Sequence, residues 1–114
     1  MHEASIAASL LEIVSGQCRK GGFSRIESIH LKIGRASGIM TDALIFAFDV
    51  MKEDSPAKEA VLEIEEVPVS GQCSDCNNTF TTEQDYILRC PRCGGNSFHM
   101  TGGREMDVID MEVS

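Results

Sequence analysis

Residues 73–94 read CSDCNNTFTTEQDYILRCPRCG, and within them Cys73 is paired with Cys76 and Cys90 with Cys93. Two residues between paired cysteines allow a tight turn that aims both sulfur atoms at one point. Two such turns brought together give a closed tetrahedral site of four sulfurs, which is a common ligand set of structural zinc. The spacing therefore predicts a zinc-ribbon module whose Zn(II) has no open position for a substrate.

The residues around the two cysteine pairs support this interpretation and leave two alternatives open. Gly94 directly follows the second pair and suits the positive φ that such a turn often needs. Phe80, Tyr86 and Leu88 lie between the pairs, and we expect them to form a small apolar core within a hairpin. Iron could use the same ligands, and the cysteines could be redox-active or merely buried, but four at this spacing favour zinc.

The composition of the chain argues against nucleic acid as a partner and against a membrane span. The 114 residues include 18 acidic and 10 basic ones, which gives a formal net charge of −8. Phosphate backbones attract clustered Lys and Arg, but the cysteine module has only Arg89 and Arg92. The chain has no stretch of about 18 apolar residues for a membrane span. Its start lacks the basic segment of a signal peptide, so we expect a cytoplasmic protein with reduced cysteines.

The segments on either side of the cysteine module have the pattern of a small α+β domain. Residues 68–71 break the strand pattern, and the last strand is too short to fold alone. We therefore predict a three-stranded sheet with two helices from residues 1–69 and 104–114, and an inserted zinc-ribbon module from residues 70–103. The expected elements are helices over residues 4–20 and 43–52 and strands over residues 28–33, 60–67 and 104–113.

The second predicted helix has two features that the structure can test. Thr41 or Asp42 can cap its start, because both side chains accept hydrogen bonds from backbone N–H groups. Its sequence, ALIFAFDVM over residues 43–51, is apolar nearly all round, so we expect most of it to be buried.

The remaining reactive side chains give no sign of an enzyme. Cys18 lies on the apolar face of the first helix, so we interpret it as a packing residue. His30 is expected on a partly exposed sheet face, and His99 lies in an unrelated segment. The chain has no phosphate-binding glycine loop and no nucleophile–base pair, so we expect no catalytic activity.

The N-terminus offers an unusual set of metal donors. His2 directly follows Met1, and a bulky second residue leaves the initiator methionine in place. The chain then presents a free α-amine, the amide nitrogen and imidazole of His2, and the carboxylate of Glu3. Nitrogen donors with a nearby carboxylate suit Ni(II). From the residues alone, a solvated His2 without a metal remains the commoner alternative.

Several segments together resemble the hydrogenase nickel-incorporation family, HypA/HybF. They are MHEASIAASLLEIV at residues 1–14, IHLKIG at 29–34, LIFAFD at 44–49 and both cysteine pairs. They follow one another in the right order over essentially the whole chain. The resemblance implies a nickel metallochaperone for the maturation of [NiFe] hydrogenase and, in some bacteria, of urease.

The resemblance also implies site residues and partners. Met1, His2 and Glu3 match the family's nickel-binding start, and the four cysteines match its zinc ligands. The implied partners are the hydrogenase large-subunit precursor and a nickel-related maturation GTPase that is HypB-like. Family members often have an acidic residue at the position of Met40, and Asp42 is the nearest carboxylate here. A fourth nickel side-chain ligand therefore stays open, and a zinc-ribbon interaction module is the competing function.

Overall fold

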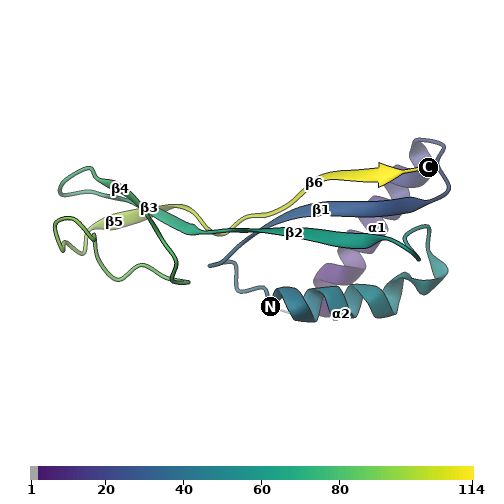
Figure 1. Ribbon diagram of the computed structural model, residues 1–114, viewed down its shortest axis with the longest axis horizontal. Helices are drawn as coiled ribbons and strands as arrows, with labels where there is room; N and C mark the ends of the chain where they lie inside the picture. Colours follow the sequence, from purple (N-terminus) through teal and green to yellow (C-terminus); the bar gives the residue numbers. More distant parts are fainter. Residues whose placement is uncertain (1–2) are drawn as a thin grey trace. The chain divides into compact units, whose positions relative to one another are not determined.

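The computed structural model describes residues 3–114, which form two compact units (Figure 1). Unit 1 takes the chain up to Leu31, together with Ile39–Glu65 and Asp107–Ser114. Unit 2 consists of Lys32–Gly38 and Glu66–Met106. Each unit is thus assembled from segments that lie far apart in the sequence.

The elements confirm the predicted α+β class with two helices. The strands form two sheets with the orders β2-β1-β6 and β4-β3-β5. The second sheet was not predicted, because β3 begins where the sequence pattern suggested a break. In chain order the elements are α1 (Glu3–Lys20), β1 (Ile26–Gly34), α2 (Thr41–Met51), the 3-10 helix η1 (Lys52–Asp54), β2 (Val61–Val67), β3 (Val69–Cys73), β4 (Thr79–Thr82), β5 (Phe98–Gly102) and β6 (Met106–Val113).

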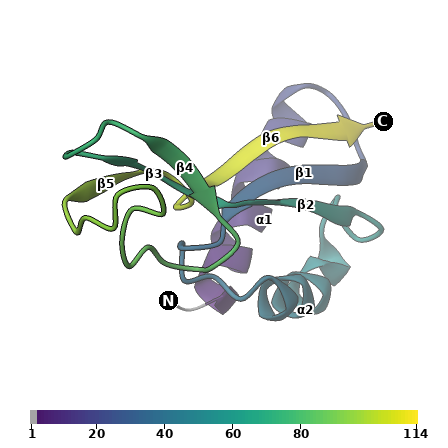
Figure 2. The same cartoon turned by 60° about the vertical axis from the view of Figure 1, so that its left-hand side comes forward.

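Unit 1 has an apolar core to which both helices and the first sheet contribute. Figure 2 shows α1 and α2 packed together beside the strands β2, β1 and β6. Cys18 is fully buried in this core, which confirms that it packs on the apolar face of its helix. Burying one large apolar side chain contributes about 1.5–3 kcal/mol. Buried members of this core include Ala7, Leu10, Val14, Cys18, Ile26, Ile29, Leu31, Leu44 and Phe48.

The start of α2 differs from its prediction. The helix begins at Thr41, and Met40 is its N-cap without any side-chain cap hydrogen bond, so neither Thr41 nor Asp42 caps it. Instead, the backbone N–H of Met40 donates a hydrogen bond of 3.0 Å to Oε2 of Glu3. A carboxylate from the beginning of α1 thus replaces the expected local cap.

The burial of α2 is also lower than its composition suggested. Only Leu44 and Phe48 are buried, one turn apart on one side of the helix. Phe46 and Val50 are 72% and 62% exposed. The prediction that most of α2 is buried was therefore wrong, because apolar composition does not show how many faces of a helix find a partner.

Unit 2 is organised around β3, which pairs antiparallel with both β4 and β5. Gly71 of β3 lies between Phe80 of β4 and Met100 of β5. A Cβ atom on Gly71 would lie 2.8 Å from Cδ1 of Ile87, so the absence of a side chain lets Ile87 approach the sheet closely.

The expected hairpin and core between the cysteine pairs are corrected by this arrangement. The hairpin is formed by β3 and β4, on either side of the first pair. Tyr86 and Leu88 are 54% and 73% exposed, so they do not form the small core predicted for them. Ile87, which stands between them, packs toward the sheet instead.

Candidate metal centre

The two cysteine pairs lie in turns of the same backbone form. In the first turn the N–H of Asn77 donates to the carbonyl of Cys73 at 3.0 Å, and in the second the N–H of Gly94 donates to the carbonyl of Cys90 at 2.9 Å. Asn77 and Gly94 both have positive φ, 60° and 74°. This confirms the conformation expected of Gly94, and Asn77 fits the first turn because asparagine tolerates this region better than most residues.

Backbone N–H groups in the second turn point at the sulfur atoms. The N–H of Arg92 lies 3.4 Å from Sγ of Cys90, and the N–H of Gly95 lies 3.4 Å from Sγ of Cys93. Such donors stabilise a thiolate relative to a thiol. The turn therefore prepares its sulfur atoms to bind a cation.

Backbone hydrogen bonds and neighbouring sulfurs together separate the pKa values of Cys90 and Cys93. Hydrogen bonding from the backbone of Cys93 is the main cause that lowers the pKa of Cys90 to about 6, against the effect of burial. For Cys93, the backbone N–H of Gly95 lowers the pKa, but the neighbouring Cys73 and burial together raise it to about 12. One ionised sulfur thus opposes ionisation of its neighbours, and a cation among them would remove that conflict.

The distances between the sulfurs fit a tetrahedral ion. Sγ of Cys73 lies 3.5 Å from Sγ of Cys93, and Sγ of Cys76 lies 3.7 Å from Sγ of Cys90. These distances are far longer than the ~2.05 Å of a disulfide. A tetrahedron with metal–sulfur bonds of about 2.3 Å has sulfur–sulfur edges of about 3.8 Å. All four ligand atoms lie within 4.8 Å of one another, so the four cysteines can hold one metal ion.

The predicted nickel residues lie only partly within the described chain. Met1 and His2 fall outside residues 3–114. Glu3 is the first residue of α1, and its hydrogen bond to Met40 places its carboxylate at the loop before α2. That loop leads within two residues to Asp42, in the first turn of α2. Sequence reasoning missed this contact, because no local signal links residues that are 37 positions apart.

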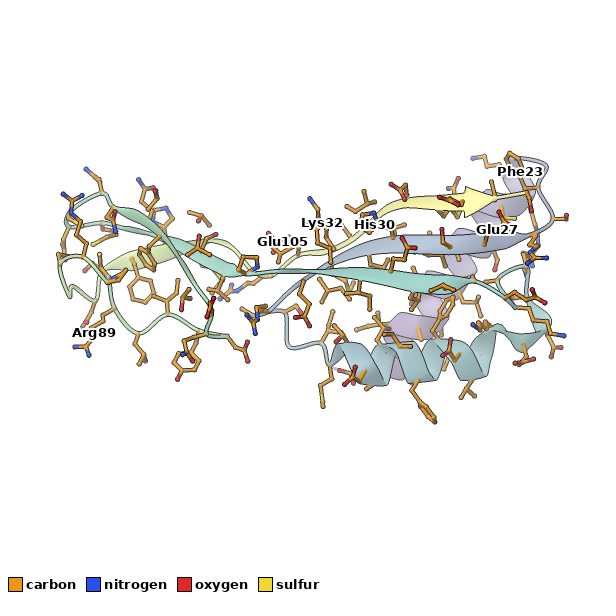
Figure 3. The ribbon with its side chains drawn as sticks, in the orientation of Figure 1. Phe23, Glu27, His30, Lys32, Arg89 and Glu105 are labelled. Carbon is orange, nitrogen blue, oxygen red and sulfur yellow. The ribbon has the colours of Figure 1, made fainter. Side chains whose placement is uncertain are left out.

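The histidines within the described chain do not join the cysteine cluster. His30, labelled in Figure 3, lies in β1 with Nε2 3.7 Å from a carboxylate oxygen of Glu65 and Nδ1 3.8 Å from one of Asp110. Its side chain is 34% exposed, as predicted for a sheet face. His99 lies in β5 and is exposed. Within residues 3–114, the four cysteines are the group with metal-ligand spacing.

Comparisons with known proteins agree along the full chain. A family model described as hydrogenase/urease nickel incorporation, metallochaperone, hypA matches residues 1–113. The hydrogenase maturation factor HypA of Paracoccus denitrificans is 42% identical over 113 residues, which is 99% of each chain. The protein of the same name from Chloroflexus aurantiacus is 40% identical over the same share.

The fold is shared with solved structures. The solution structure of the Ni metallochaperone HypA from Helicobacter pylori matches with a TM-score of 0.68 and 28% identity over 99% of this chain and 97% of that chain. A second match, a solution structure of HypA protein, has a TM-score of 0.73, also at 28% identity. None of the helices within residues 3–114 is both long and apolar enough to cross a membrane. Sequence and fold thus agree from end to end, and this protein belongs to the HypA family of hydrogenase/urease nickel-incorporation metallochaperones.

Proposed function

We propose that this protein binds Ni(II) at its N-terminus and delivers it, in the cytoplasm, to the precursor of a [NiFe] hydrogenase large subunit. The observation that carries the proposal is the family match over residues 1–113. It is supported by relatives that are named hydrogenase maturation factors over nearly their whole length. Urease is a possible second client, because the family description includes it.

The cysteine cluster is proposed to hold Zn(II) as a structural ion. Thiolate ligands select soft or borderline metals, and a tetrahedral set of four thiolates is typical of zinc. The ion would neutralise part of the sulfur charge and join the two turns. Its binding energy would then be folding energy for unit 2. Four protein ligands complete the tetrahedron, so this site would not exchange its metal during delivery.

Nickel is proposed to bind to the α-amine, His2 and Glu3, with Asp42 as a further candidate. The hydrogen bond between Glu3 and Met40 supports this arrangement, because it ties the start of α1 to the loop that leads to Asp42. Both the amine and the imidazole must lose a proton to bind a metal, and the N-terminal end of a helix opposes a cation. These effects favour moderate, releasable binding, which a carrier needs.

The proposed partners follow from the same role. A hydrogenase precursor would receive the nickel, and a HypB-like GTPase would take part in loading or transfer. We propose that residues 1–69 with 104–114 serve nickel binding and that residues 70–103 serve zinc binding. No catalytic turnover is expected of either part.

The experiment that tests this function compares the full chain, with its native N-terminus, with the variant His2→Ala. We expect both proteins to contain about one zinc, and only the unaltered chain to bind about one further nickel. The competing function, a zinc-ribbon module for protein or nucleic-acid interaction, predicts no specific nickel uptake by either protein. Equal nickel binding by both proteins would exclude His2 from the proposed site.

A further inference from the structure

A groove of about 340 Å³ lies in unit 2, between strand β4 and the loop that leads to the second cysteine pair. Residues 80–82 of β4 form one wall, and Tyr86, Leu88 and Arg89 are among the loop residues that form the other. We call this feature the β4 groove. It lies beside the cysteine cluster, and neither the zinc site nor the nickel site uses it.

The loop wall of the β4 groove is held in place at two points. Ile87 packs over Gly71 of the central strand. Asp85 forms an ion pair with Arg35, in which Oδ1 of Asp85 lies 3.6 Å from the guanidinium Nε. These contacts lie on either side of Tyr86 and connect the loop to the central strand and to Arg35 of the same unit.

Two large apolar side chains of this wall, Tyr86 and Leu88, are exposed. Tyr86 and Leu88 stand on either side of Ile87 and, like it, line the groove. Both are largely exposed, with Leu88 at 73%. Two exposed apolar side chains on one loop give a partner apolar contact area.

The other wall offers backbone hydrogen-bonding groups. Strand β4 is an edge strand, because its sheet has the order β4-β3-β5. Its residues 80, 81 and 82 all line the groove, although consecutive side chains of a strand point to opposite faces. The groove therefore follows the edge of the strand, where N–H and C=O groups without a strand partner point outward.

Arg89 adds a positive charge at this site. Its side chain, labelled in Figure 3, projects away from the loop. No ion-pair partner of Arg89 is found among the residues that the structure describes. The chain as a whole carries a net charge of −8, so an anionic group would be repelled by most of the protein and held locally by this guanidinium.

We propose that the β4 groove binds an extended segment of another protein that carries an apolar residue followed by a carboxylate. The segment adds to β4 as a further strand, its apolar side chain contacts Tyr86 and Leu88, and its carboxylate pairs with Arg89. Strand addition to a free sheet edge is a common mode of peptide recognition. We take this partner to be a client of metal delivery, and that identification rests on the proposed function. The binding chemistry of the groove does not rest on it.

The test uses the full, zinc-loaded, nickel-free chain labelled for NMR. The probe is a seven-residue synthetic peptide of alternating threonine and valine that ends in leucine and aspartate. We expect saturable binding, with the largest amide shifts at residues 80–82 and 86–89. A peptide that ends in leucine and lysine amide should bind at least about fivefold more weakly, because Arg89 repels it.

Two charge reversals separate the groove from general electrostatics. Arg89→Glu should weaken the aspartate peptide by about tenfold or more and should improve binding of the lysine peptide. Arg104→Glu is the matched control, because Arg104 is also exposed and lies in unit 2 but does not line the groove. It should change the affinity for either peptide by less than about twofold. Leu88→Ser should weaken both peptides without loss of zinc.

The proposal fails if the aspartate peptide does not bind at millimolar concentration, or if its shifts lie outside the groove. It also fails if both charge reversals weaken binding equally, which would indicate a diffuse charge effect. Shifts that appear at residues 80–89 when the protein alone is concentrated would identify a second copy of the chain as the occupant and would overturn the assignment. Because no nickel is present, none of these outcomes depends on the proposed nickel site.

Discussion

At the residue scale, single long-range contacts decide the roles of Glu3 and Gly71. Glu3 lies where a nickel ligand was predicted, and in the structure its carboxylate accepts a hydrogen bond from the backbone N–H of Met40. Gly71 lies in a strand, where side chains are usual, yet only glycine leaves room here for Ile87. Both roles depend on residues distant in sequence, so neither could be seen from local pattern.

The Glu3–Met40 contact predicts a graded effect of two substitutions on stability. Glu3→Ala removes the acceptor from the N-terminus of α2, so it should destabilise the protein by about 1 kcal/mol, as the loss of an N-cap does. Glu3→Gln keeps an acceptor oxygen and should cost less. Thermal unfolding and hydrogen exchange of the Met40 amide, both on nickel-free protein, measure this. Unchanged exchange of that amide in Glu3→Ala would show that the contact does not persist in solution.

The packing at Gly71 predicts a substitution that destabilises unit 2. The Cβ atom of Gly71→Ala would lie 2.8 Å from Cδ1 of Ile87 and 3.1 Å from the carbonyl oxygen of His99. Overpacking of this kind typically costs about 1–3 kcal/mol. We expect a lower melting temperature and faster zinc loss to a chelator.

Two further variants check that the cause is the clash. Ile87→Val lacks the Cδ1 atom, so it should restore part of the stability of Gly71→Ala. Gly16→Ala makes the same substitution in α1, where a Cβ meets nothing within 4 Å, and it should be neutral or stabilising because alanine favours helix. Equal destabilisation by both alanine substitutions would contradict the argument.

At the element scale, periodic pattern predicted most of what the structure shows. Both helices and the strands of the first sheet lie close to their expected positions, because an apolar pattern bounded by turn residues predicted each of them. The cysteine spacing predicted the metal cluster, since two turns of one form follow from two Cys-X-X-Cys pairs. The pattern failed at β3, where Pro68 and Gly71 looked like a break. It also failed for α2 and the loop around Tyr86, because exposure there depends on tertiary partners.

The second cysteine turn predicts how the metal responds to acid. A protonated thiol does not bind metal, so a fall in pH makes more protons compete with the ion. With its pKa raised to about 12, Cys93 carries a proton at neutral pH in the metal-free cluster, whereas Cys90, with a pKa of about 6, has mostly lost its proton. Zinc binding at pH 7 should therefore release protons, and the affinity for zinc should fall as the pH falls from 7 to 5.

Two measurements check the acid response. Calorimetric zinc titration in buffers of different ionisation enthalpy gives the number of protons released, and metal analysis after dialysis at pH 7 and pH 5 gives the retention. Cys93→Ser should lose zinc at both pH values. Zinc content that stays at one per chain at pH 5 and in Cys93→Ser would show that the four thiols are not the ligands.

At the scale of the whole molecule, the two proposed metal sites belong to two units, and we expect the folding of these units to depend on metal to different degrees. Unit 1 has a core of large apolar side chains from both helices and a sheet. The described part of unit 2 has fewer fully buried side chains, and two of them are Cys73 and Cys90. We therefore expect unit 2 to depend on its ion, and unit 1 to fold whether or not nickel is present.

The last prediction separates the two metals by altering the N-terminus. A few residues added before Met1 keep His2 and Glu3 but turn the α-amine into an amide, while His2→Ala keeps the amine and removes the imidazole. If amine and imidazole close one chelate on nickel, each change should weaken nickel binding at least tenfold, about 1.4 kcal/mol. Zinc content should stay unchanged, because the proposed zinc ligands are the four cysteines and none of them lies at the N-terminus. The outcome is decided by calorimetric nickel titrations at one pH, with zinc analysis of each protein. Cys73→Ser is the reverse control, because it removes a proposed zinc ligand and leaves the N-terminus unaltered. If the extended protein binds nickel as tightly as the native chain, the amine is not a ligand, and His2 must act with carboxylates such as Glu3 or Asp42.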